Sequence, residues 1–387
     1  CLNARFRGVD CSLCADACPA KGAIGVTNGK PILDNGACLH CGLCLHICPT
    51  EAYTRPDGLA GRLVKLVAAL PAGPVDLLCP QHPRPDAGAA PQAVQTRRCL
   101  AALAPATLLE VAATGREIRL DDTPCPDCPL GNIHPALQKT AAEANAWAGL
   151  LAHAPPVALR SGPDDDTPPA AARPVYDVDQ PPLSRRSWLG SLKKMGEEVS
   201  AAEEAVAMVK AGKSVPVAER LPQSLPHQRA RILSILKKSS LNQSPVSQSP
   251  VSQSPITNDQ LPTAGLPIST LNVDPARCTA CGLCARFCPT GALRFLSDGE
   301  AFALTFQPLF CLGQACDICV PACPEQAVSA SAATVTADLP AKKTLAAGNV
   351  RPCRQCGQPV AAGPELPATC FACRPKAAAS DLFGWKK

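Results

Sequence analysis

The amino-acid sequence predicts an α+β protein made of several small domains. Three observations lead to this fold class. The chain has 387 residues, which is more than one small domain needs. It has only 8 Phe, 3 Trp and 2 Tyr, which argues against one large core. Its 24 Cys and 42 Pro favour small metal-stabilised modules that are joined by proline-rich connectors.

The spacing of the cysteines indicates metal binding. Of the 24 Cys, 20 lie in Cys-x2-Cys or Cys-x3-Cys pairs. Disulfide frameworks belong mainly to short secreted chains and space their cysteines irregularly. The pattern therefore argues against a disulfide scaffold.

We expect seven segments, which differ in cysteine content and in apolar pattern. In chain order they are a cysteine-rich module at 1–58, a small α/β domain at 59–160, a connector at 161–186, a helical segment at 187–238, a low-complexity linker at 239–270, a second cysteine-rich module at 271–332 and a four-cysteine module at 350–376.

The N-terminal module holds two cysteine runs that each end in Cys-Pro. They are Cys1-x9-Cys11-x2-Cys14-x3-Cys18-Pro19 and Cys38-x2-Cys41-x2-Cys44-x3-Cys48-Pro49. Loops with two residues between cysteines present successive sulfurs at the corners of a cube, as an iron–sulfur cubane requires. Gly42 lets the loop backbone pass close to such a cluster.

The middle domain combines apolar stretches with four more cysteines. Cys79 follows PVDLL, Cys99 precedes LAALAPATLLEVAA, and Cys125-x2-Cys128 follows EIRLDD. This order predicts a strand, a helix and a strand, with the cysteines gathered at the strand ends of an α/β sheet. We expect a further metal site there, a 2Fe–2S cluster or zinc, with buried free thiols as the alternative. His82 and His134 lie nearby in the sequence and are expected at the surface.

The segments between the modules are expected to lack a core of their own. Residues 164–182 are rich in Pro and Asp, and residues 244–256 repeat SPVSQ, which is typical of a solvated linker. Two helices are predicted between these segments, at 188–210 and at 230–238, from apolar residues that share one helical face.

The second cysteine-rich module repeats the signature of the first. Its runs are Cys278-x2-Cys281-x2-Cys284-x3-Cys288-Pro289 and Cys311-x4-Cys316-x2-Cys319-x3-Cys323-Pro324. The four runs resemble the two-cluster bacterial ferredoxin family, within polyferredoxin-type proteins. The middle region is loosely similar to the iron–sulfur delta subunit that links hydrogenase to heterodisulfide reductase.

The ferredoxin resemblance implies four 4Fe–4S clusters, each completed by the last cysteine of the neighbouring run. Carried over, the four ligand sets are Cys1, Cys11, Cys14 and Cys48; Cys38, Cys41, Cys44 and Cys18; Cys278, Cys281, Cys284 and Cys323; and Cys311, Cys316, Cys319 and Cys288.

The last four cysteines form two knuckles. Cys353-x2-Cys356 and Cys370-x2-Cys373 are separated by 13 residues, which is zinc-ribbon spacing. Rubredoxin-like iron would use the same ligands. We predict zinc, with iron as the alternative.

These observations predict an electron carrier rather than an enzyme. No G-x-G-x-x-G or Walker loop occurs, and the thiols are accounted for as ligands. A scaffold or assembly protein of a redox complex, with structural clusters, is the alternative. An enzyme with a catalytic cluster would need a cluster that lacks one cysteine ligand, and the four complete runs argue against it. The formal charge of +5 does not indicate nucleic-acid binding, because each bound cluster with its thiolates adds about −2.

We expect the partners to be redox enzymes, such as a hydrogenase or a formate dehydrogenase. No apolar stretch reaches the roughly 18–20 residues of a membrane span. Arg185 and Arg186 lie in a twin-arginine-like SRRSWL, but this motif is internal and no apolar region follows it. We therefore predict a cytoplasmic location.

Overall fold

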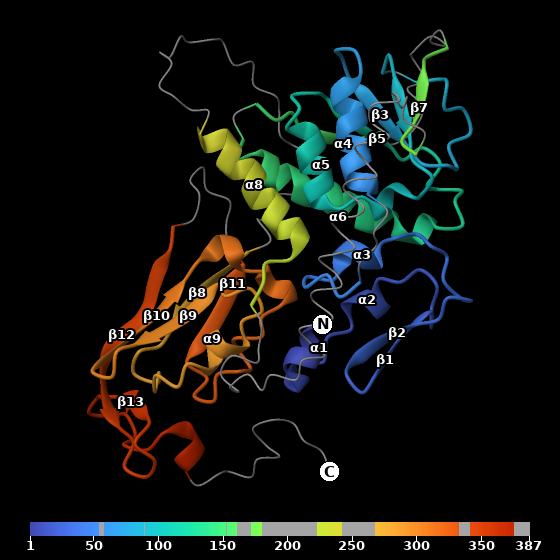
Figure 1. Ribbon diagram of the computed structural model, residues 1–387. Helices are drawn as coiled ribbons and strands as arrows, with labels where there is room; N and C mark the ends of the chain where they lie inside the picture. Colours follow the sequence, from blue (N-terminus) through green and yellow to red (C-terminus); the bar gives the residue numbers. More distant parts are fainter. Residues whose placement is uncertain are drawn as a thin grey trace, which may run out of the picture.

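The computed structural model describes residues 1–53, 58–88, 90–151, 153–160, 172–179, 223–241, 268–332 and 341–374. The N-terminal module and a middle α/β domain lie on one side of the molecule, and the C-terminal sheets lie on the other (Figure 1). Helix α8 (His227–Leu241) runs between the middle domain and the C-terminal module (Figure 1).

Short elements make up the N-terminal module. They are the helices α1 (Leu2–Arg5), α2 (Leu13–Asp16) and α3 (Cys44–Ile47), and the antiparallel strands β1 (Ile24–Thr27) and β2 (Lys30–Leu33). Asn28 and Gly29 join the two strands, and both have positive φ, as the favoured two-residue hairpin turn requires. A module with so little regular structure and so few buried side chains needs a staple such as a metal cluster.

A parallel sheet forms the centre of the middle domain. Its strand order is β6-β5-β3-β4-β7, with β3 (Val75–Leu78), β4 (Ala93–Gln95), β5 (Ile118–Asp121), β6 (Val157–Arg160) and β7 (Val175–Asp177). All four residues of β3 are buried, as expected for the central strand of a sheet that is covered on both faces. The helices of the domain are α4 (Leu59–Ala69), α5 (Pro105–Ala112) and α6 (His134–Ala148).

The strand order creates a crevice at one edge of this sheet. From β3 the chain moves to β4 on one side, and it then returns to β5 on the other side. The loops after these strands therefore diverge at the carboxyl edge of β3, which is where open α/β sheets bind ligands. Cys79, Cys99 and Cys125 lie in these three loops.

The connector that we predicted at 161–186 contains a strand, so the prediction is wrong for residues 172–179. Strand β7 pairs in parallel with β4, and Arg173, just before it, forms a buried ion pair with Asp76 in β3. Arg173 also donates hydrogen bonds to the carbonyl oxygens of Pro85 and Ala90. The strand was missed because it has only three residues and lies in a segment rich in Pro and Asp.

Helix α8 contacts both the N-terminal module and the middle domain. The carboxylate of Glu51 in the N-terminal module accepts hydrogen bonds from the backbone N–H groups of His227 and Gln228, at 2.8 and 2.6 Å, and so caps the helix. Ile232 and Leu236 are buried in a cluster with Trp147 of α6. The predicted helix at 188–210 and the repeat at 244–256 lie outside the described residues.

Two antiparallel sheets build the C-terminal module. One pairs β11 (Val328–Ala332) with β8 (Ser269–Val273), and the other has the order β13-β12-β10-β9. The latter comprises β9 (Leu293–Ser297), β10 (Ala301–Phe306), β12 (Lys343–Pro352) and β13 (Pro359–Ala361), and α9 (Leu283–Phe287) packs against β9. The β9–β10 hairpin occupies the long interval between Cys288 and Cys311. Strand β12 leads directly into the four-cysteine segment, so this segment is continuous with the sheet.

Candidate metal centres

The N-terminal module brings its eight cysteines together in two sets. Cys1, Cys11, Cys14 and Cys48 line one small cavity. In the second set, burial and the thiolates of Cys41, Cys38 and Cys18 raise the pKa of Cys44 to about 11. Cys48 and Cys18 thus each lie with the cysteines of the other run.

Backbone N–H groups surround these sulfurs. Those of His40 and Ala52 donate to the sulfurs of Cys38 and Cys48, at 3.4 and 3.3 Å. The loop can turn its N–H groups inward because His40 and Gly42 have positive φ, 52° and 82°. Hydrogen bonds of this kind tune the potential of a bound cluster.

The C-terminal module repeats the arrangement. Cys278, Cys281, Cys284 and Cys323 line a cavity with Phe295 and Val328. Burial and the thiolates of Cys281, Cys323 and Cys278 raise the pKa of Cys284 to about 12. In the other set, burial and the thiolates of Cys288 and Cys311 raise the pKa of Cys316 to about 12. The pKa of Cys319 is also raised, by burial and by the thiolates of Cys311, Cys316 and Cys288.

The raised pKa values have a chemical consequence. Thiols with a pKa near 11 or 12 keep their protons at neutral pH when no cation balances them. A bound iron–sulfur cluster supplies that positive charge, so loading displaces protons and is favoured by rising pH. Burial is the first cause of the shift for Cys44, Cys284 and Cys316.

The four cysteines of the middle domain also meet. Cys79, Cys99, Cys125 and Cys128 line a cavity of about 310 Å³ at the carboxyl edge of the parallel sheet. Burial and the thiolates of Cys79, Cys41 and Cys128 raise the pKa of Cys99 to about 11. Cys41 belongs to the N-terminal module, and it lines the same cavity.

The contact between the N-terminal module and this cavity escaped the sequence analysis. An added Cβ at Gly42 would come within 2.7 Å of the Cβ of Ala102, which lies in the short turn Leu100–Ala102 after Cys99. The Nε2 of His46 lies 2.7 Å from the carbonyl oxygen of Ala101. Neither contact leaves a sequence signal, because both join segments more than 50 residues apart.

His82 does not lie at the surface, so our expectation is wrong for this residue, whereas His134 is partly exposed. The side chain of His82 is 6% exposed, and its Nε2 lies 3.1 Å from Asp121. The side chain of His134 is 27% exposed, and its Nε2 lies 2.7 Å from Asp122. Both histidines contact carboxylates where β5 ends, one turn before Cys125, and so they support this loop.

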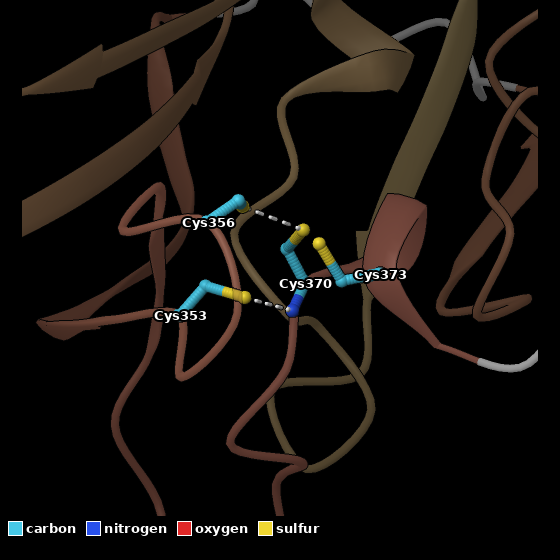
Figure 2. A group of neighbouring side chains, drawn as sticks. All are labelled: Cys353, Cys356, Cys370 and Cys373. Carbon is cyan, nitrogen blue, oxygen red and sulfur yellow. Dashed lines mark hydrogen bonds between the residues drawn. The ribbon is translucent and has the colours of Figure 1, made fainter.

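The last four cysteines form the tightest group. The sulfurs of Cys353, Cys356, Cys370 and Cys373 all lie within 4.8 Å of one another and point toward a common centre (Figure 2). The backbone N–H of Cys370 donates a hydrogen bond to the sulfur of Cys353 at 3.2 Å. Several backbone N–H groups lower the pKa of Cys353, and that of Cys370 has the largest effect. Within the described residues, no other group of Cys, His, Asp and Glu is this compact. The group could hold a single metal ion, whereas the sulfurs of the other described cysteine sets do not lie this close together.

Comparison with known families identifies both cysteine-rich modules. Residues 9–53 match the 4Fe-4S dicluster domain, and residues 271–294 match the 4Fe-4S binding domain. The chain is an iron–sulfur protein with two ferredoxin-type domains. Domains of this kind indicate electron transfer and fit a carrier rather than a catalyst. No curated protein matches the chain. In the described part of the chain, no helix combines the length and apolar character needed to cross a membrane.

Proposed function

We propose that this chain is a polyferredoxin-type electron carrier that relays single electrons through four 4Fe–4S clusters. The observation that carries the proposal is the exchange of one cysteine between the two runs of each module. Cys48 shares a cavity with Cys1, Cys11 and Cys14, and Cys323 shares one with Cys278, Cys281 and Cys284. This exchange is the ligation pattern of two-cluster ferredoxins.

Each set of four would hold one cubane. The ligands would be Cys1, Cys11, Cys14 and Cys48; Cys38, Cys41, Cys44 and Cys18; Cys278, Cys281, Cys284 and Cys323; and Cys311, Cys316, Cys319 and Cys288. A bound cubane supplies a one-electron couple. The chain supplies thiolates, N–H donors such as those of His40 and Ala52, and burial that keeps water from the sulfurs.

We further propose an iron–sulfur cluster, rather than zinc, at Cys79, Cys99, Cys125 and Cys128. Two features support it: the set is more open than the four-cysteine group at 353–373, and it shares its cavity with Cys41 of a predicted cubane. A redox centre next to a cubane can pass electrons on, whereas zinc cannot, because Zn²⁺ has no redox chemistry. The loose similarity to the delta subunit of hydrogenase–heterodisulfide reductase complexes points the same way.

The remaining assignments complete the proposal. The compact sulfurs of Cys353, Cys356, Cys370 and Cys373 favour a zinc ribbon over rubredoxin-like iron. Metal analysis of a Cys356→Ala variant tests this, because the variant should lose zinc in the first case and one iron in the second. We propose a redox enzyme, such as a hydrogenase or a formate dehydrogenase, as the partner and the cytoplasm as the location. Cell fractionation tests the location, and recovery of the loaded protein outside the cytoplasm would contradict it.

Metal analysis of anaerobically loaded protein tests the proposed function. We expect about 16 irons from four cubanes, with further iron at the middle site. The visible absorbance should bleach with dithionite and return on reoxidation. The Cys125→Ala variant should lose the further iron and keep the rest. An inert spectrum would support a scaffold with structural clusters, and zinc lost from Cys125→Ala in place of iron would contradict the middle-site assignment.

A further inference from the structure

The N-terminal and C-terminal modules meet at a small apolar junction. Phe6 directly follows α1, and its ring packs edge-on against that of Phe287 at the end of α9, with centroids 4.9 Å apart. Phe6 is buried in a cluster with Ile318 and Ala322 of the C-terminal module. Phe287 and Ile318 adjoin Cys288 and Cys319 in the sequence. The junction therefore lies against one of the four predicted cluster sites.

Arg5 crosses this junction. Its Nε donates a hydrogen bond to the carbonyl oxygen of Phe287 at 2.8 Å, and its Nη2 donates one to that of Cys288 at 3.1 Å. The two bonds fix the guanidinium in place, which is the geometry that arginine provides and lysine does not. Arg5 belongs to the N-terminal module, four residues after Cys1, and yet its guanidinium contacts the C-terminal module.

The charge of Arg5 interacts electrostatically with two cysteines of the C-terminal module. Burial lowers the pKa of Arg5, and the thiolates of Cys288 and Cys316 oppose that change. Both cysteines belong to the set completed by Cys311 and Cys319.

Two other charges face this set. Arg229 of α8 acts on Cys311, and Asp317 of the C-terminal module acts on Cys316 with the opposite sign. Arg229 is itself close to the carboxylate of Glu143, which offsets part of its charge. Arg5 is the cation that the N-terminal module contributes.

We propose that Arg5 raises the reduction potential of the cluster held by Cys288, Cys311, Cys316 and Cys319, and so makes it the preferred electron site when the two modules are docked. This inference rests on the proposed function. A reduced cluster carries one more negative charge than an oxidised one, and a fixed guanidinium stabilises that charge. With both modules loaded, one electron would pass from a cluster of the N-terminal module to this one, with no bond or proton changed. The contact of Arg5 across the junction would favour electron transfer toward this site.

Redox-titrated EPR of the loaded full-length chain tests the role of Arg5. A Cys316→Ala variant first identifies the signal of the cluster concerned, because that signal should be missing from its spectrum. In Arg5→Gln, we expect the ratio of reduced to oxidised cluster at a fixed potential to fall about tenfold for that signal, equivalent to about 59 mV for a one-electron couple. Arg5→Lys keeps the positive charge, so the midpoint potential of this cluster should stay close to the wild-type value. Lys30→Gln removes an exposed charge from β2 of the same module and should change nothing.

The outcomes separate this inference from the proposed function. If wild-type protein lacks reducible clusters, the proposed function fails before any variant is titrated. If the clusters titrate normally and Arg5→Gln leaves all midpoints in place, or moves all of them equally, the role of Arg5 is refuted. Should Arg5→Gln fail to load its clusters, Arg5→Met supplies a second neutral side chain whose apolar stem fits the junction with Phe6, and the same shift is expected.

Discussion

The exchange of Cys18 and Cys48 between the two runs predicts in which double variants the losses of iron add up. Replacing Cys14 or Cys48 by Ala should damage the same cubane, because both line one cavity. Replacing Cys44 or Cys18 should damage the other, because these thiols act on each other together with Cys38 and Cys41. Alanine is preferred over serine, since a serine oxygen can replace the lost thiolate.

The expected magnitudes follow from four irons in each cubane. Each single variant should lose up to about four of about 16 irons. The double variant of Cys14 and Cys48 should lose no more than either single variant, whereas the double variant of Cys14 and Cys44 should lose up to about eight.

Iron analysis and low-temperature EPR of the reduced protein measure both outcomes. The Cys48→Ala and Cys14→Ala proteins should lack the same signal, and the Cys44→Ala protein should lack a different one. If Cys48→Ala and Cys44→Ala removed the same signal, the exchange between runs would be wrong, and each run would hold its own cluster.

Two further predictions concern charges that join distant segments. Arg173→Met should destabilise the middle domain by about 3 kcal/mol, because the fully buried Asp76 loses this ion pair and keeps, among the described residues, the weaker one with Arg160 at 3.9 Å. Urea unfolding followed by the fluorescence of the buried Trp147 measures the change, and a loss below about 1 kcal/mol would show that the Arg173–Asp76 ion pair adds little to stability. Arg374→Gln removes the partner of Glu325, whose carboxylate lies 3.0 Å from the guanidinium and acts on Cys278 and Cys281. The potential of the cluster at Cys278 should fall in this variant and rise in Glu325→Gln, and equal midpoints in a redox titration of both would contradict the coupling.

The sequence predicted the features that depend on local spacing. The Cys-x2-Cys-x2-Cys-x3-Cys-Pro runs identify ferredoxin-type domains because a cubane constrains a short loop, and the family matches at 9–53 and 271–294 confirm this interpretation. The gathering of Cys79, Cys99 and Cys125 was also predictable, since strands of a parallel sheet end at one edge. The ligand sets themselves stay predictions.

Short strands and long-range contacts were not predictable. Strands β4 and β7 have three residues each, too few for an apolar period to appear above the composition of their surroundings. The packing of Phe6 on Phe287 joins residues 281 positions apart, and nothing in either local sequence marks it. His82 looks like an ordinary loop histidine until the fold places it beside Asp121.

Gly42 limits how freely the N-terminal module could be exchanged for another one. Within the module, its positive φ shapes the loop around the sulfurs. Toward the middle domain, it leaves space for Ala102, which any side chain at this position would meet. A ferredoxin grafted here with a different residue at this position could still bind its clusters and yet sit too far from Cys99. Replacement of the module by recombination or by design must therefore preserve a contact that plays no part in metal binding.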